Sequence, residues 1–218
     1  MFRRIFEIQP RLPAGTALTI GIAALLTVMF PVTWSFVRYF STMAHEGFHA
    51  IVDSTVGFRI TGVRLNLLGA KGKTSVSGEA SSFPSLMLGY LGPSAFGLAA
   101  AKLISVGHSD AVLWLSLGLL LLLLAQVRNI IGILLIAIAG YVIYIFARYG
   151  TVSRQTMAAY GIAWLLLLSG VRWVLLHWYN SGDGTILKSQ TGSEPVVFAR
   201  IWLVGTLFAL LLGTRLLM

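Results

Sequence analysis

The sequence predicts an all-α polytopic membrane protein with about six to seven transmembrane helices and a short β-hairpin at the membrane surface. Hydrophobic residues make up 57% of the 218 residues and charged residues only 11%, and the mean hydropathy is +0.85. Several apolar runs reach the roughly 20 residues that a helix needs to cross a bilayer. Because these runs leave little sequence for a soluble region, we expect residues 1–218 to form a single membrane-embedded domain.

The charged residues also fit a membrane protein better than a nucleic-acid-binding protein. The formal net charge is +9, but the Lys and Arg residues are spread over predicted helix ends and short loops. This placement is typical of membrane topology signals and of contact with anionic lipid headgroups. The chain has no cysteine, so disulfides and thiolate metal ligands are excluded, and histidines and carboxylates are the candidate ligands.

The first two predicted helices cover residues 14–30 and 33–55. Pro31 separates them, because a proline ends or kinks a helix. No long polar loop lies between the two segments. We therefore expect a tight helical hairpin, with one long bent helix as the alternative.

Residues 57–82 predict a β-hairpin at the membrane surface. Polar and apolar residues alternate over residues 58–61 and 63–67, as they do in strands, and residues 69–72 have the composition of a turn. An apolar segment rich in small residues follows at 84–106, where the small side chains allow close approach between helices. Further spans are predicted at 111–127, 129–147, 156–178 and 196–217, and a polar loop at 179–194 joins the last two.

The positive charges near the N-terminus predict that this end lies in the cytosol. Two crossings would then return the hairpin at 57–82 to the cytosolic side, and the loop at 179–194 would lie there too. The same count places Arg148 and Arg154 outside, against the usual charge rule. The localisation we expect is integral and multi-pass, in a bacterial plasma membrane.

A candidate metal site lies within the second predicted helix, at His45, Glu46 and His49. Residues four apart share one helix face, so the two imidazoles can bind one metal ion, with Glu46 as general base beside it. A zinc ion there would lower the pKa of a water molecule and polarise the carbonyl to be cleaved. An accidental match is the alternative, but ionisable groups in a bilayer each cost about 2.5–3.5 kcal/mol, which favours a compensating ligand.

A catalytic zinc ion usually has three protein ligands, so one more residue is required. Asp53 lies about 12 Å from the first histidine along the helix axis, which suits it better to orienting a ligand than to being one. His108 and Asp110 lie in a predicted loop on the opposite side, and His177 is a possible substitute ligand. Asp183 is the best remaining carboxylate, although its surroundings also fit an ordinary turn.

Four features in this order resemble the site-2 protease family of intramembrane zinc metalloproteases. They are the His-Glu motif in residues 44–50, the β-rich segment, the glycine-rich residues 89–94, and Asp183 followed by glycine. The pattern is most similar to the compact M50B-like branch, in which a late Asp precedes a Thr, a Pro and a Trp. The corresponding residues here are Asp183, Thr191, Pro195 and Trp202.

The resemblance implies zinc (Zn²⁺) bound by His45, His49 and Asp183, with Glu46 as the catalytic base. It also implies single-span membrane proteins as substrates, cut within their transmembrane segments. The hairpin could pair with an unwound substrate segment by strand addition. The chain departs from the family pattern in the position of Gly47 and in lacking the Asn-Pro stretch before the late Asp.

Two other functions remain open at this point. A catalytically inactive relative could keep the site as a structural or regulatory zinc centre, although such a centre has no need of Glu46 as a base. A transporter could use intramembrane polar groups to line a path for a metal ion. The sequence has no repeat symmetry, and its intramembrane polar groups concentrate at one site. The sequence indicates no nucleic-acid partner and leaves the oligomeric state open.

Overall fold

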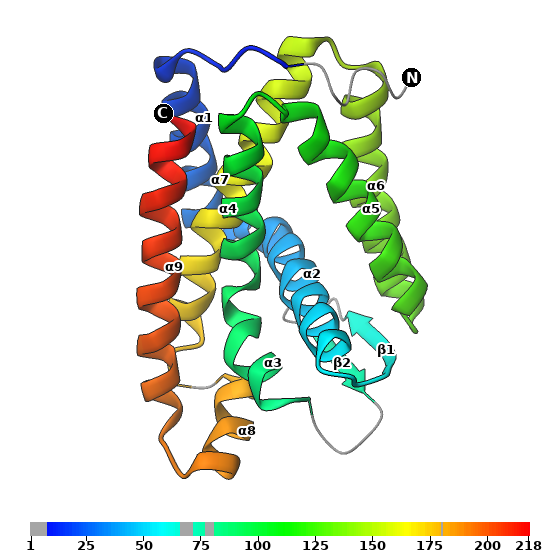
Figure 1. The fold of residues 1–218 in the computed structure, drawn as a ribbon, viewed down its shortest axis with the longest axis vertical. Helices are drawn as coiled ribbons and strands as arrows, with labels where there is room; N and C mark the ends of the chain where they lie inside the picture. Colours follow the sequence, from blue (N-terminus) through cyan, green and yellow to red (C-terminus); the bar gives the residue numbers. More distant parts are fainter. Residues whose placement is uncertain (1–7, 66–71, 77–80, 180) are drawn as a thin grey trace.

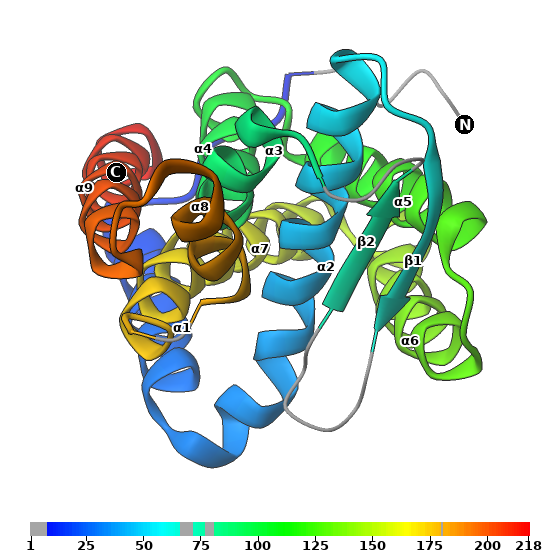
Figure 2. The same cartoon turned by 90° about the horizontal axis from the view of Figure 1, so that it is seen from below.

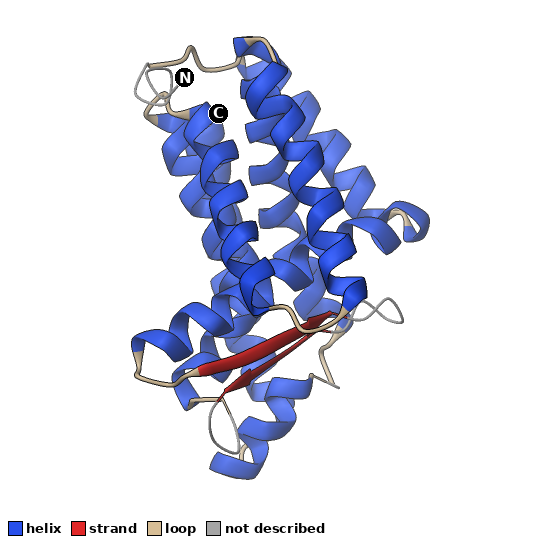
Figure 3. Ribbon diagram, turned by 90° about the vertical axis from the view of Figure 1, so that its right-hand side faces the viewer, coloured by secondary structure: helices blue, strands red, loops and turns tan. Residues whose placement is uncertain are grey.

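Helices dominate the computed structural model, which describes residues 8–65, 72–76, 81–179 and 181–218. Most of them run along one long axis, and a two-stranded antiparallel sheet lies across one end (Figure 1, Figure 3). In chain order the elements are α1 (Ala14–Met29), α2 (Pro31–Thr55), β1 (Ile60–Leu65), β2 (Gly72–Val76), α3 (Phe83–Leu88), η3 (Gly89–Leu91), α4 (Gly92–Ser105), α5 (Ser109–Gln126), α6 (Ile130–Tyr149), α7 (Val152–Leu176), α8 (Gly182–Thr191) and α9 (Pro195–Leu217).

The described residues contain five helical segments long and apolar enough to cross a membrane. The bent pair α1 and α2 makes a sixth if it is taken as one span. The five are Phe83–Ser105, Ser109–Gln126, Ile130–Tyr149, Val152–Leu176 and Pro195–Leu217. Together with the antiparallel sheet they confirm the predicted all-α membrane fold with a β-hairpin. Large apolar side chains such as Leu121 and Leu122 are exposed, as expected of helices that face lipid.

The two N-terminal helices meet at a sharp bend rather than in a tight hairpin. Phe30 has an extended backbone and Pro31 starts α2, and the angle between the two helices is 101°. Arg172 of α7 stabilises this bend, because its guanidinium donates hydrogen bonds to the carbonyl oxygens of Val28 and Met29 at the end of α1. Carbonyls at a helix end have no partner within the helix, so a nearby cation satisfies them.

The hairpin forms where it was predicted and is braced by the loop between α5 and α6. β1 and β2 pair antiparallel, with Val63 opposite Thr74. The amide nitrogen of Arg128 donates to the carbonyl of Val63 at 2.9 Å. The Asn129 side chain accepts from the Leu65 nitrogen at 3.0 Å and donates to the Leu65 oxygen at 2.6 Å. Most of the turn predicted at residues 69–72 lies outside the described residues.

The predicted polar loop at 179–194 contains a helix, α8. Ser181 caps its start, since the Ser181 hydroxyl accepts a hydrogen bond from the Gly184 nitrogen at 3.0 Å. Gly192 ends the helix with φ of 77°, a left-handed conformation that favours glycine. Pro195 then starts α9. Asp183 therefore sits in the first turn of a helix rather than in a simple turn.

The start of the described chain and the hairpin lie at opposite ends of the molecule (Figure 1). The Gln9 nitrogen donates to the Gly107 oxygen in the loop between α4 and α5, and Arg11 donates to Leu216 near the C-terminus. The expected return of the hairpin to the N-terminal side was therefore wrong. The reason is the bend of 101° at Pro31, which keeps α1 and α2 from forming the antiparallel pair of crossings that was expected.

Candidate metal centre

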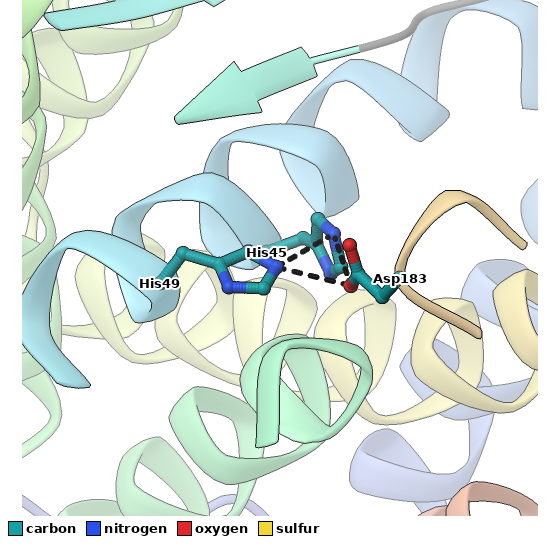
Figure 4. A group of neighbouring side chains, drawn as sticks. All are labelled: His45, His49 and Asp183. Atoms are coloured by element: carbon teal, nitrogen blue, oxygen red, sulfur yellow. Dashed lines mark hydrogen bonds and ion pairs between the residues drawn. The ribbon is translucent and has the colours of Figure 1, made fainter. Parts of the chain in front are cut away.

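Three side chains from two distant segments converge at the end of the molecule that carries the sheet (Figure 4). His45 and His49 come from successive turns of α2, and Asp183 comes from the first turn of α8. The Nε2 atoms of the two histidines are 3.2 Å apart. Asp183 Oδ2 is 3.1 Å from His49 Nε2 and 3.5 Å from His45 Nε2.

These spacings fit a tetrahedral metal ion. Ligand atoms that each lie about 2.0–2.1 Å from a tetrahedral zinc are about 3.3–3.4 Å from one another. All three measured separations are within a few tenths of an ångström of that value. Two imidazoles and one carboxylate form a donor set typical of catalytic zinc, and three protein ligands leave the fourth position for water or substrate. His45 and His49 are buried, so the group is shielded from bulk water.

The charge on Asp183 also suits a cation. Burial on its own would raise the pKa of this carboxyl, but the hydrogen bond with His49 and the neighbouring His45 hold the pKa below its ordinary value. The first turn of a helix further favours a negative side chain, because the helix dipole is positive there. Asp183 is therefore ionised at neutral pH and available as a ligand.

The His49 ring is held on two sides by the segment α3–η3. The Ser85 hydroxyl lies 2.8 Å from His49 Nδ1, which leaves Nε2 for a metal ion and fixes the orientation of the ring. Gly89 presses directly on the ring, since a Cβ atom at this position would lie 2.3 Å from His49 Nε2. Only glycine fits this contact. Gly89 belongs to the segment at 84–106, whose small residues were predicted to allow close approach between helices.

His45 lies against an aromatic pair. The Tyr90 ring meets the His45 ring edge to face at 5.0 Å and stacks on Trp202 at 4.2 Å. Trp202 Nε1 donates to the Met87 oxygen at 2.7 Å, so the stack is tied to the backbone of α3. Trp202 belongs to the late sequence pattern and Tyr90 to the glycine-rich residues 89–94, but the sequence did not predict that either side chain would lie beside a histidine.

Glu46 is buried with 4% of its surface exposed. Its Oε2 atom accepts a hydrogen bond of 2.6 Å from the Thr74 hydroxyl on β2. Sequence reasoning did not identify Thr74, because the alternating pattern of a strand does not say which residue meets another element. Glu46 therefore lies between the histidine pair on its own helix and the hairpin.

The other candidate ligands lie outside the group. Asp53 accepts from the Ser82 nitrogen at 3.0 Å and from the Ser82 hydroxyl at 2.7 Å, and so anchors the start of α3. His177 Nδ1 contacts the Trp173 oxygen at 2.9 Å, and its ring lies 6.3 Å from that of Tyr90. His108 and Asp110 start α5, at the opposite end from the hairpin (Figure 1).

The sequence model of the family described as Peptidase M50B-like matches residues 18–213. This range covers nearly the whole chain and includes His45, Glu46, His49 and Asp183. No curated protein and no solved structure matches the chain.

Proposed function

Because the chain belongs to the M50B-like peptidase family, we propose that it is an intramembrane zinc metalloprotease that cleaves peptide bonds within the transmembrane segments of single-span membrane proteins. The spacing of His45, His49 and Asp183 carries the proposal. The family supports a metallopeptidase, and the long apolar helices support an integral multi-pass protein. Residues 1–218 act in this proposal as one membrane-embedded domain.

His45, His49 and Asp183 hold the zinc ion in this mechanism, and Glu46 acts as the base. Bound zinc supplies a Lewis acid that acidifies water and polarises a carbonyl. Glu46 accepts a proton from the attacking water as the new carbon–oxygen bond forms. It then delivers that proton to the nitrogen of the departing amine as the carbon–nitrogen bond breaks. The buried position of Glu46 keeps competing bulk water away from both transfers.

The hairpin offers an edge on which an unwound substrate can be held. Peptide bonds in a helix are internally hydrogen-bonded, so a transmembrane substrate must be extended before it is cut. The outer edge of β1 is already in use, because Val63 bridges to Val127 and binds Arg128. β2 lies between β1 and α2 (Figure 2), so in this proposal a substrate segment adds to the other edge of β2, on the side of the metal centre.

Bacterial plasma membrane as the location and a cytosolic N-terminus remain predictions. If the N-terminus is cytosolic, the hairpin and α8 lie toward the outer side, since they are at the opposite end of the molecule (Figure 1). Basic residues occur at both ends. Arg11 and Arg154 lie at one end and Arg59 and Arg128 at the other, so the basic residues are divided between the two sides.

The decisive experiment combines metal analysis with a cleavage assay. Wild type, Glu46→Gln and a His45→Ala/His49→Ala double variant are purified in detergent and their zinc content is measured. Cleavage of a panel of epitope-tagged single-span membrane proteins is followed in parallel. We expect one zinc per chain in wild type and Glu46→Gln, loss of zinc in the double variant, and cleavage by wild type alone.

Zinc absent from the wild type would contradict the proposal. Zinc retained without cleavage of any substrate would instead favour a catalytically inactive relative with a structural or regulatory metal centre. Metal uptake into proteoliposomes by wild type would indicate a transporter.

A further inference from the structure

A hydrogen bond joins the hairpin to Glu46. The Thr74 hydroxyl oxygen is 2.6 Å from Glu46 Oε2 and 3.2 Å from the Glu46 backbone oxygen. A hydroxyl group has one proton to donate, and the shorter distance assigns that proton to the carboxylate. Glu46 is only 4% exposed, so water competes poorly for this contact. One carboxylate oxygen is thereby engaged, and Oε1 is the oxygen left to exchange a proton.

The position of Thr74 is itself fixed by the far side of the bundle. Thr74 pairs with Val63 across the sheet, and Val63 is the residue of β1 to which the α5–α6 loop attaches. Val63 is fully buried. A continuous set of contacts therefore runs from the loop at 127–129 through Val63 and Thr74 to Glu46.

Because β2 is pleated, only Thr74 among its neighbours in the strand faces Glu46. Successive side chains of a strand point to opposite faces, so Lys73 and Ser75 point away from the face on which Thr74 meets Glu46. A change of register by one residue would replace the threonine at Glu46 with a neighbour on the wrong face. The Asn129 and Arg128 contacts hold β1 in place on the α5–α6 loop, and the pairing of Val63 with Thr74 sets the register of β2 on β1.

We propose that Thr74 is a positioning residue for Glu46, which holds Oε2 so that the carboxylate keeps the orientation needed for proton transfer. This inference rests on the proposed function, because it assigns Glu46 the role of base. Thr74 acts through Glu46 and does not contact the metal ligands. The hairpin thus both offers an edge to the substrate and orients the base that serves the reaction.

The test compares Thr74→Val, which keeps the shape but removes the hydroxyl, with Thr74→Ser, which keeps the hydroxyl. Thr61→Val is the matched control, because it makes the same change at an exposed position of β1. kcat and KM are measured with the member of the epitope-tagged single-span panel that wild type cleaves best. Zinc content and melting temperature are recorded for each variant.

We expect Thr74→Val to lower kcat by roughly 10- to 100-fold, the effect typical of losing a buried hydrogen bond to a charged group. KM and zinc content stay at the wild-type values, and Thr74→Ser recovers most of the rate. A Thr74→Val variant that cleaves like Thr61→Val would overturn the proposal. So would a change confined to KM, or a loss of rate in Thr74→Ser equal to that in Thr74→Val.

An infrared measurement separates this inference from the proposed function. The carboxyl band of Glu46 is identified as the band that Glu46→Gln removes, and it can be followed without substrate. A shift of that band in Thr74→Val that is absent in Thr74→Ser supports the positioning contact, even if wild type cleaves no member of the panel. An unchanged band in Thr74→Val overturns the positioning role whatever the fate of the protease proposal.

Discussion

Gly89→Ala tests whether the metal centre depends on the contact between η3 and α2. A Cβ atom at this position would lie 2.3 Å from His49 Nε2 and 2.4 Å from His49 Cε1. Non-bonded heavy atoms prefer separations of about 3.5 Å or more, so the ring or the η3 backbone must move by roughly 1 Å. Movement of the ring would disturb its contacts with Ser85 at 2.8 Å and with Asp183 at 3.1 Å.

The expected result is a loss of metal affinity larger than the loss of fold stability. Changes to the groups that orient a metal ligand typically weaken binding 10- to 100-fold, and a displaced ligand ring belongs at the upper end of that range. Gly47→Ala is the matched control, since it adds a methyl group to α2, the helix that carries the histidines, where the new Cβ atom meets no other segment within 4 Å. An alanine in a helix is favoured over glycine by about 1 kcal/mol, so this control should melt no lower than wild type.

Zinc affinity is measured for both variants by competition with a chelating dye, and helicity by circular dichroism. Gly89→Ala should bind zinc at least 10-fold more weakly than Gly47→Ala while keeping its helical spectrum. Equal affinities in the two variants would refute the assignment of His49 Nε2 as a ligand atom held by the Gly89 contact. If Gly89→Ala loses helicity, zinc affinity is measured for Ser85→Ala instead, because this variant removes the other contact to the His49 ring without adding an atom.

Three further predictions follow from the same geometry. Asp183→Ala should release zinc whereas His177→Ala should retain it. Metal analysis showing the reverse would make His177, rather than Asp183, the third ligand. Arg172→Met should lower the stability of the fold by about 2 kcal/mol, because carbonyls at the end of α1 lose a charged donor, and an unchanged melting temperature in detergent would contradict this. The chain has no cysteine, so Arg11→Cys and Thr61→Cys can each be labelled with a membrane-impermeant maleimide. The two cysteines should react from opposite sides of sealed vesicles. Labelling of both from the same side would refute the interpretation of α1 and α2 as one broken crossing.

The parts of the fold that depend on local pattern were predictable from the sequence. Long apolar runs gave the membrane helices, alternating residues gave the strands, and the four-residue spacing of His45 and His49 placed both rings on one face of a helix. Each of these signals acts within one segment of the chain. The glycine-rich residues 89–94 also predicted close packing, although not that a histidine ring would be the partner.

The missed features depend on contacts between distant segments or on weak local signals. Pro31 predicted a break, but the 101° angle is set with the help of Arg172, which is far away in the sequence. Helix α8 did carry local signals: Ser181 is a typical capping residue, Gly192 a typical terminal residue, and Pro195 a proline that follows the helix end. The segment is nevertheless too polar to show the apolar periodicity of a packed helix, so the sequence predicts a loop there. Thr74 could not be predicted, since the strand register was unknown.

The bend at Pro31 explains how these separate segments reach one site. A straight continuation of α1 would keep the next residues parallel to the bundle, where neighbouring helices surround them. At 101°, α2 instead crosses the bundle near the end that carries the sheet (Figure 2), and its 25 residues extend over about 37 Å. The turns around His45 and His49 are then accessible to the hairpin at Thr74, to η3 at Gly89 and to α8 at Asp183. The angle of α2, more than the spacing within it, allows Asp183 to meet the histidine pair and Thr74 to meet Glu46.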